Sequence, residues 1–157
     1  FLPTTRLPFG NMRVAAGPRE TMLLFGGPEN DQHLISYDGE RHATLLRLSD
    51  PIAVVTHVAD RIFLAAGNKL YTVRPGEPPA LMFLFPVGSE IVGLTANART
   101  GEIFVSTADA VFALDRGVAE KKLAGLGGRL QWRDGRLYVL DPVQSVFARV
   151  SFIGNGN

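Results

Sequence analysis

The stretch Asp134-Gly135-Arg136-Leu137-Tyr138-Val139-Leu140 decides the fold. An Asp-Gly pair favours a two-residue type I′ turn, because both central residues of that turn need a positive φ. The apolar and aromatic run after the pair has the composition of a short β-strand. The stretch therefore predicts a strand that begins directly after a hairpin turn.

Three earlier segments share this form, a polar residue followed by a short apolar or aromatic run. They are residues 21–25 (TMLLF), 61–65 (RIFLA) and 102–106 (EIFVS). Together with residues 136–140, their starts are 40, 41 and 34 residues apart. Spacings of this size are typical of propeller blades and other repeat arrays.

Each segment has further strand candidates on both sides. A second short run comes after it at residues 34–37, 70–73, 111–114 and 146–150, and the turn pairs Asp38-Gly39, Pro75-Gly76 and Arg116-Gly117 end three of these runs. A strand precedes at 12–16, 52–58, 91–96 and 130–133, and a fourth strand lies at 43–48, 80–85 and 118–123. Because the turn pairs recur together with the runs, the repeat predicts four-stranded antiparallel meanders.

A single meander cannot bury both of its faces, but copies stacked around an axis can. The segments resemble the repeats of quinoprotein-like and NHL-like β-propellers, in which a D/G-[RE]-[IL]-[FY]-V strand precedes an x-[VL]-[FY]-x-[VL] strand. The resemblance covers residues 11–153 and implies an all-β fold, a small propeller of about four four-stranded blades. Five lean blades, an open partial propeller and a β-sandwich are the alternatives.

We expect one propeller-like domain over residues 1–157, with repeats at 11–50, 51–87, 88–128 and 129–153. The last repeat lacks a fourth strand, so residues 1–9 are expected to fill that place and close the ring. Since the chain begins with Phe1, we expect a piece of a longer protein. That start and the propeller resemblance favour a periplasmic or extracellular location in a bacterial type of protein.

The composition excludes several classes of partner and site. Sixteen basic and fifteen acidic residues leave a net charge of +1, which argues against a nucleic-acid partner, because phosphate binding needs a concentrated basic face. The absence of cysteine excludes disulfides and thiolate metal sites. No run approaches the roughly 18 apolar residues of a transmembrane helix.

No catalytic constellation, metal-ligand spacing or cofactor motif is present in the sequence. The glycine-rich residues 125–128 are not followed by Lys-Ser/Thr, and we interpret them as a flexible connector. The innermost strands carry Arg13, His57, Thr95 and Arg133, which could line a central channel and bind a small anion or metabolite. The simpler interpretation is that the two arginines face solvent and that His57 is hydrogen-bonded structurally.

Residues 81–85 are apolar on both faces of their strand, which strand alternation does not explain. An outermost strand normally has one face in water. Either an insertion or a neighbouring chain covers this strand, or Leu81, Phe83 and Phe85 form a protein-interaction surface.

The leading functional hypothesis is a non-catalytic binding or scaffold module that mediates protein–protein interaction within a larger protein. One alternative is small-anion or metabolite binding, or catalysis, in the channel near His57. The other is a structural domain that drives self-association as a homo-oligomer. The identity of the ligand or partner does not follow from the sequence.

Overall fold

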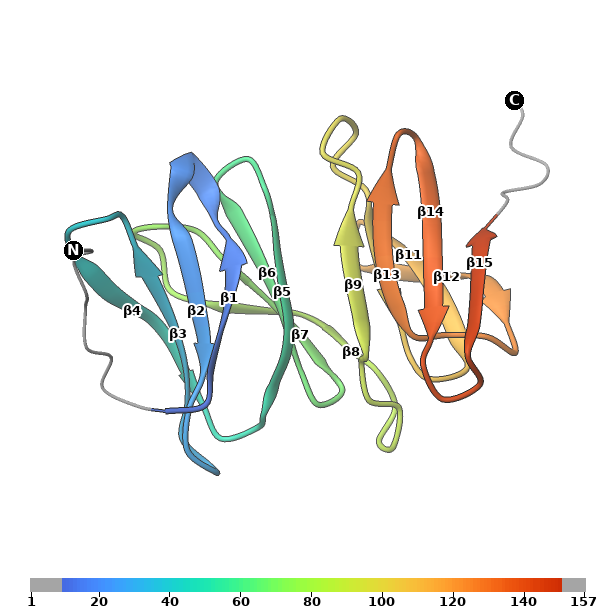
Figure 1. The fold of residues 1–157 in the computed structure, drawn as a ribbon, viewed down its shortest axis with the longest axis horizontal. Helices are drawn as coiled ribbons and strands as arrows, with labels where there is room; N and C mark the ends of the chain where they lie inside the picture. Colours follow the sequence, from blue (N-terminus) through green and yellow to red (C-terminus); the bar gives the residue numbers. More distant parts are fainter. Residues whose placement is uncertain (1–9, 151–157) are drawn as a thin grey trace.

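The computed structural model describes residues 10–150, which form four antiparallel sheets in chain order (Figure 1). Sheet 1 contains β1 (Met12–Ala16), β2 (Met22–Gly26), β3 (Gln32–Tyr37) and β4 (His42–Leu48). Sheet 2 contains β5 (Ile52–Val58), β6 (Arg61–Ala66), β7 (Lys69–Val73) and β8 (Ala80–Leu84). Sheet 3 contains β9 (Gly93–Ala96), β10 (Ile103–Ser106), β11 (Ala110–Asp115) and β12 (Val118–Ala124). Sheet 4 contains β13 (Arg129–Arg133), β14 (Arg136–Asp141) and β15 (Val146–Val150).

Every sheet is a meander of neighbouring strands, and the turns have the predicted chemistry. In sheet 4, Arg133 pairs with Arg136, so Asp134 and Gly135 alone form the turn between β13 and β14. Their φ angles are 52° and 76°, the positive values that a type I′ turn requires. A short 3-10 turn, η1 (Pro18–Glu20), joins β1 to β2. No helix in residues 10–150 is long and apolar enough to cross a membrane.

The buried side chains form three clusters, each between two successive sheets. Leu23 of sheet 1 packs with Ile62 of sheet 2 in the first cluster. Phe63 of sheet 2 packs with Ile103 of sheet 3 in the second, and Phe104 of sheet 3 packs in the third cluster with sheet 4. The predicted all-β, propeller-like stack of four repeats is therefore confirmed.

Among residues 10–150, no comparable cluster joins sheet 4 to sheet 1. Sheet 1 lies at the left and sheet 4 at the right of the view, with the inner strands β5 and β9 of sheets 2 and 3 between them (Figure 1). Within the described residues sheet 4 has three strands. Residues 1–9, predicted to supply its fourth strand and close the ring, lie outside the described residues.

The two faces of each sheet are named by the neighbouring sheet to which they point. The forward face points toward the next sheet in the chain, and the backward face points toward the preceding one. In strand β6, for example, Phe63 lies on the forward face and packs toward sheet 3, whereas Ile62 lies on the backward face and packs toward sheet 1.

Glycine allows sheets 3 and 4 to approach closely. A Cβ on Gly93 of β9 would lie 2.1 Å from the Gly128 carbonyl oxygen, a distance that side chains do not reach. The Gly128 N–H donates to the Ser106 hydroxyl at 2.9 Å. Residues 127 and 128 are buried, so they form a close backbone contact between two sheets and are not the flexible connector that the sequence predicts.

Candidate functional site

The forward face of sheet 4 carries side chains at positions that are core in the other sheets. Leu23, Phe63 and Phe104 lie at the same place in β2, β6 and β10, and they are 0%, 3% and 1% exposed. Each packs against the following sheet. The equivalent residue of β14 is Tyr138, which is only half-buried.

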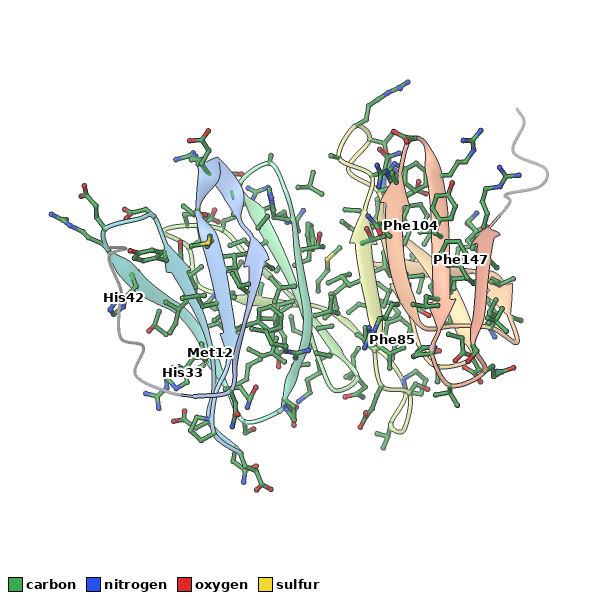
Figure 2. The ribbon with its side chains drawn as sticks, viewed as in Figure 1. Met12, His33, His42, Phe85, Phe104 and Phe147 are labelled. Carbon is green, nitrogen blue, oxygen red and sulfur yellow. The ribbon has the colours of Figure 1, made fainter. Side chains whose placement is uncertain are left out.

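The difference in side-chain exposure between sheet 4 and the other sheets is larger on the third strand of each sheet. Leu34, Leu70 and Val111 pair with Phe25, Ala65 and Ser106, and all three are 0% exposed. In sheet 4 the equivalent pair is Leu140 with Phe147. Phe147 is 68% exposed. A face that is buried between sheets elsewhere in the chain is thus open to solvent at the end of the stack (Figure 2).

The forward face of sheet 4 combines an aromatic pair with a rim of arginines. The rings of Tyr138 and Phe147 are stacked, with their centroids 5.7 Å apart and 6° between their planes. They line a hollow of about 580 Å³ together with Leu140 and Gln131. Strand alternation and pairing also place four exposed arginines on this face, namely Arg129, Arg133, Arg136 and Arg149.

The acidic residue that lines the hollow is Asp134, in the hairpin turn. Its Oδ2 lies 3.8 Å from the Nε of Arg133, and both side chains are largely exposed. An exposed pair of this kind contributes little to stability. The forward face of sheet 4 is therefore cationic around an aromatic centre, although the whole chain is almost neutral.

The backward face of sheet 1 is the corresponding open surface at the other end of the stack. Ile62, Ile103 and Leu137 occupy one position of this face in the later sheets and are 1%, 2% and 0% exposed. The equivalent residue of sheet 1 is Met22, at 45%, and its neighbour Val14 on β1 is 62% exposed.

The outer part of the backward face of sheet 1 is buried, since Ile35 of β3 is only 1% exposed. The open part is therefore its inner half, on strands β1 and β2. It is apolar, and it lacks the arginines of the forward face of sheet 4.

A guanidinium contact between sheets shows what an arginine does on a forward face. Arg13 of β1 lies over the ring of Phe25, 4.8 Å from its centroid, and its Nη2 donates to the Ile52 carbonyl oxygen at 2.5 Å. Ile52 begins β5, the first strand of the next sheet. In sheet 4, Arg129 has the same register, because it pairs with Leu140 as Arg13 pairs with Phe25.

The structure does not bring the four predicted channel residues together. Strands β1, β9 and β13 point the same way (Figure 1). Arg13 lies near the start of β1, whereas Arg133 is the last residue of β13, so they lie toward opposite ends of the inner strands. His57 Nδ1 is 3.1 Å from the Ala59 carbonyl oxygen, and the Thr95 hydroxyl accepts a hydrogen bond from the Trp132 N–H at 3.2 Å.

A different arginine shares a cavity with Arg13. The cavity has a volume of about 640 Å³ and is lined by residues of sheets 1, 2 and 4, including Arg13, Ile52 and Arg129, and by loops that adjoin sheet 3. Its two carboxylates are Glu90 and Asp141. Asp141 is buried, and its Oδ1 accepts the N–H groups of residues 143 and 144 at 2.9 and 3.1 Å, so it already has a structural role.

The apolar strand of sheet 2 divides between surface and core. Leu81 is 52% exposed, and Phe83 is half-buried. Phe85 is 3% exposed and packs between sheets 2 and 3, with its ring 4.8 Å from Phe83 and 5.1 Å from Phe112 (Figure 2). Phe85 is thus a core residue, and it cannot contact a partner while the domain is folded.

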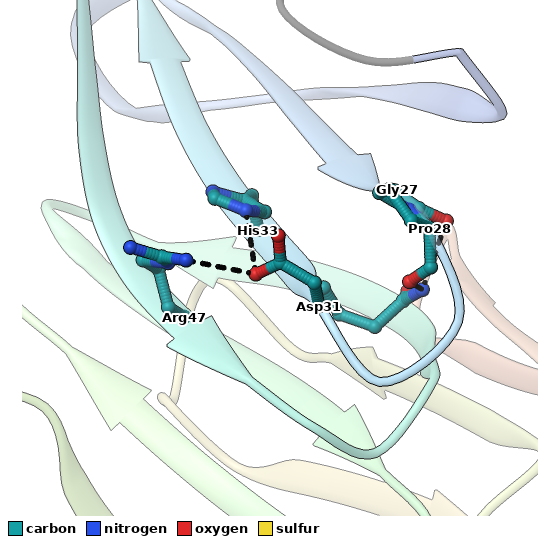
Figure 3. A network of polar contacts seen from close by, with 6 residues as sticks. Gly27, Pro28, Asp31, His33 and Arg47 are labelled. Atoms are coloured by element: carbon teal, nitrogen blue, oxygen red, sulfur yellow. Dashed lines mark hydrogen bonds and ion pairs between the residues drawn. The ribbon is translucent and has the colours of Figure 1, made fainter.

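A polar network ties β3 to β4 (Figure 3). Arg47 Nη2 donates to Asp31 Oδ1 at 3.0 Å, and His33 Nε2 lies 3.0 Å from the same oxygen. The neighbouring Gln32 donates to two loop carbonyls and accepts the Ile52 N–H, which links sheet 1 to sheet 2. Within residues 10–150, no group of three or more His, Asp or Glu side chains could hold a metal ion.

This network makes the stability of sheet 1 sensitive to acid. The hydrogen bond from Arg47 holds the pKa of Asp31 below its ordinary value of 3.8. A lowered pKa in the folded state stabilises the fold above the unfolded pKa, and that contribution is lost as the pH falls through the folded pKa. We expect the urea midpoint of the wild type to fall more steeply below about pH 4 than that of Asp31→Asn. Parallel pH profiles of the two proteins would contradict this role of Asp31.

The open faces were not found from the sequence, although one signal for them was present. The repeat has Leu, Leu and Val at the second-strand position where the last copy has Phe147, with Arg149 two residues later. Arg149 lies on the same face of its strand as this apolar position. A cationic residue there indicates that the face does not pack against another sheet in the way the earlier faces do. Recognising that signal required the strand register that the structure supplies.

The comparisons with known proteins give information only about the fold. No protein-family model matches the sequence, and no curated protein sequence matches it. The crystal structure of the computationally designed Ika4 protein is similar, with a TM-score of 0.67 over 95% of this chain and 96% of that protein. The two sequences are 9% identical. The likeness therefore concerns the propeller-like arrangement of sheets, and the resemblance to quinoprotein-like and NHL-like repeats stays a prediction.

Proposed function

We propose that this chain is a non-catalytic protein-binding module, a section of propeller that binds protein through its open end faces. The observation that carries the proposal is the 68% exposure of Phe147, at a position that is 0% exposed in each of the other three sheets. An aromatic side chain at a sheet-stacking position loses its main packing partner when the next sheet is absent.

The chemistry of the forward face of sheet 4 fits a protein partner. Tyrosine, phenylalanine and arginine are enriched at the centres of protein interfaces, where aromatic rings fill pockets and guanidinium groups bind carbonyl oxygens. Tyr138, Leu140 and Phe147 supply the apolar centre, and the arginines surround it. Leu81 of sheet 2 adds a smaller exposed apolar site away from this face.

A site-specific photo-crosslinker tests the proposal. Benzoylphenylalanine is placed at position 147 of the complete protein in the cells that produce it, and the crosslinked peptides are identified by mass spectrometry. Val87 is the matched control position, because it is 97% exposed and lies in the loop between sheets 2 and 3. We expect crosslinked protein at position 147 well in excess of that at position 87.

The pattern of products decides between outcomes. A crosslink from position 147 to a defined segment of a protein supports binding through this face. Equal, diffuse labelling at positions 147 and 87 would show that the forward face of sheet 4 is an ordinary solvent surface and would overturn the proposal.

A further inference from the structure

We propose that the partner of each open face is a second copy of this chain. The forward face of sheet 4 of one copy packs on the backward face of sheet 1 of the second copy, and the reverse contact closes the pair into one ring. This inference rests on the proposed function, because it names the protein that the open faces bind. Its basis is the set of three contacts between sheets that the chain already contains.

Each of these contacts places a forward face on the backward face of the following sheet. Within the described residues one forward face and one backward face lie outside these three clusters, on sheets 4 and 1. The exposed residues of the two faces, Phe147 on one and Val14 with Met22 on the other, lie at positions that are buried in the internal contacts. A second copy therefore presents the kind of surface that sheets 1–3 already bind.

Charge disfavours the contact of two forward faces of sheet 4. Two forward faces of sheet 4 would bring together eight guanidinium groups, four from each copy, and like charges that face each other across an interface are unfavourable. The open half of the sheet 1 face is formed by Met12, Val14, Met22 and Leu24, which carry no charge. The head-to-tail contact is the one that both charge and apolar surface favour.

The arginine rim has a specific role in this contact. Arg13 donates to the carbonyl oxygen of Ile52 across the contact of sheets 1 and 2 while its side chain stays exposed. Arg129 has the register of Arg13, and Met12 has the register of Ile52, because they pair with equivalent residues of the second strand. Arg129 of one copy is thus placed to donate to the Met12 carbonyl of the second copy.

A head-to-tail contact makes either a closed ring or an open filament. Two copies contribute eight sheets, which is within the roughly four to eight blades of known propellers. Three copies would exceed that range. Closure at two copies uses every open face once and leaves none for a filament.

Sedimentation of the full chain over a concentration series is the first test. We expect a species of twice the 17.0 kDa chain mass. Phe147→Asp places a carboxylate on the forward face of sheet 4, and Val14→Asp places one on the backward face of sheet 1. Each variant alone is expected to be monomeric. Val87→Asp, at a still more exposed site away from both faces, is expected to remain dimeric.

Mixing the two monomeric variants distinguishes head-to-tail pairing from other modes. The intact sheet 4 face of Val14→Asp can bind the intact sheet 1 face of Phe147→Asp, so a one-to-one dimer held by a single contact is expected. Its affinity should be lower than that of the wild type, which has two contacts. Arg129→Ala should weaken the wild-type dimer by about a hundredfold, because each of its two contacts loses one hydrogen bond to a charged group, at about tenfold for each bond.

Several outcomes would overturn the inference. A wild-type chain that stays monomeric, a Val14→Asp variant that still dimerises alone, or a mixture that stays monomeric would each do so. Circular dichroism of each variant shows whether loss of the dimer comes from unfolding, and a misfolded variant is replaced by Met22→Asp or Leu140→Asp on the same face. If the chain is monomeric but position 147 crosslinks to a different protein, the inference fails and the proposed function stands.

Discussion

Gly128→Ala is expected to destabilise the fold by about 4 kcal/mol, from two separate causes that each cost roughly 1–3 kcal/mol. Gly128 has a φ of +150°, a conformation that side chains rarely adopt. A Cβ there would also lie 2.1 Å from the Leu140 carbonyl oxygen, which belongs to β14 and cannot move without distorting sheet 4. The loss is a large fraction of the total stability of a typical domain, and a urea unfolding curve measures it.

Gly125→Ala is the matched control, because it separates conformation from crowding. Gly125 also has a positive φ, of +85°, but a Cβ there meets nothing within 4 Å. The expected cost is therefore only the roughly 1–2 kcal/mol of a left-handed conformation. Equal losses for the two variants would show that the close approach of Gly128 to the Leu140 carbonyl contributes nothing.

Phe104→Ala is expected to cost about 3–5 kcal/mol, the usual loss when a fully buried aromatic ring is removed. Phe104 is 1% exposed and lies in the cluster between sheets 3 and 4. Its ring stacks on Trp132, with centroids 5.2 Å apart and 9° between the planes. Because Trp132 is the single tryptophan of the sequence, its fluorescence reports the unfolding of this contact directly.

Phe104→Leu is the matched variant, since it keeps an apolar side chain of similar volume. Its expected cost is below about 1.5 kcal/mol. A loss for Phe104→Ala no greater than that for Phe104→Leu would mean that sheet 4 contributes little packing energy to the stack.

The repeat could be read from the sequence because its signals are local. Each turn pair and each alternating run lies within a few residues, so the strands around Asp134-Gly135 follow from the chemistry of those residues alone. The prediction of an all-β fold with four repeats used only these local signals. The shortened last repeat was visible for the same reason, since its third run is followed only by Ser151, Phe152 and Ile153 and then by Gly and Asn residues.

Which residues of neighbouring strands lie side by side was harder to predict from the sequence. Arg13 and Arg133 each lie on the first strand of their sheet, but Arg13 is near the start of its strand and Arg133 is at the end of its strand. Whether two such residues meet depends on the common direction of the strands and on their register. Arg129, four residues before Arg133, is the arginine that shares a cavity with Arg13.

Exposure of a sheet face depends on contacts that are distant in the sequence. Phe85 and Phe147 are both phenylalanines at the edge of an apolar run, yet one is 3% and the other 68% exposed. The difference arises because Phe85 lies between two sheets, whereas Phe147 lies on the forward face of sheet 4, outside the three clusters between sheets. No local pattern separates these environments.

The row of three cores also determines how the molecule loses structure. Within residues 10–150 each hydrophobic cluster joins two successive sheets, so the free energy of the array approximates a sum of sheet terms and nearest-neighbour terms. The terminal sheets have one neighbour each and the central sheets have two. Partial opening should therefore begin at the ends, with amide protons of β6 and β10 exchanging most slowly. Pairing of the two ends would remove this difference and make the four sheets open as one cooperative unit.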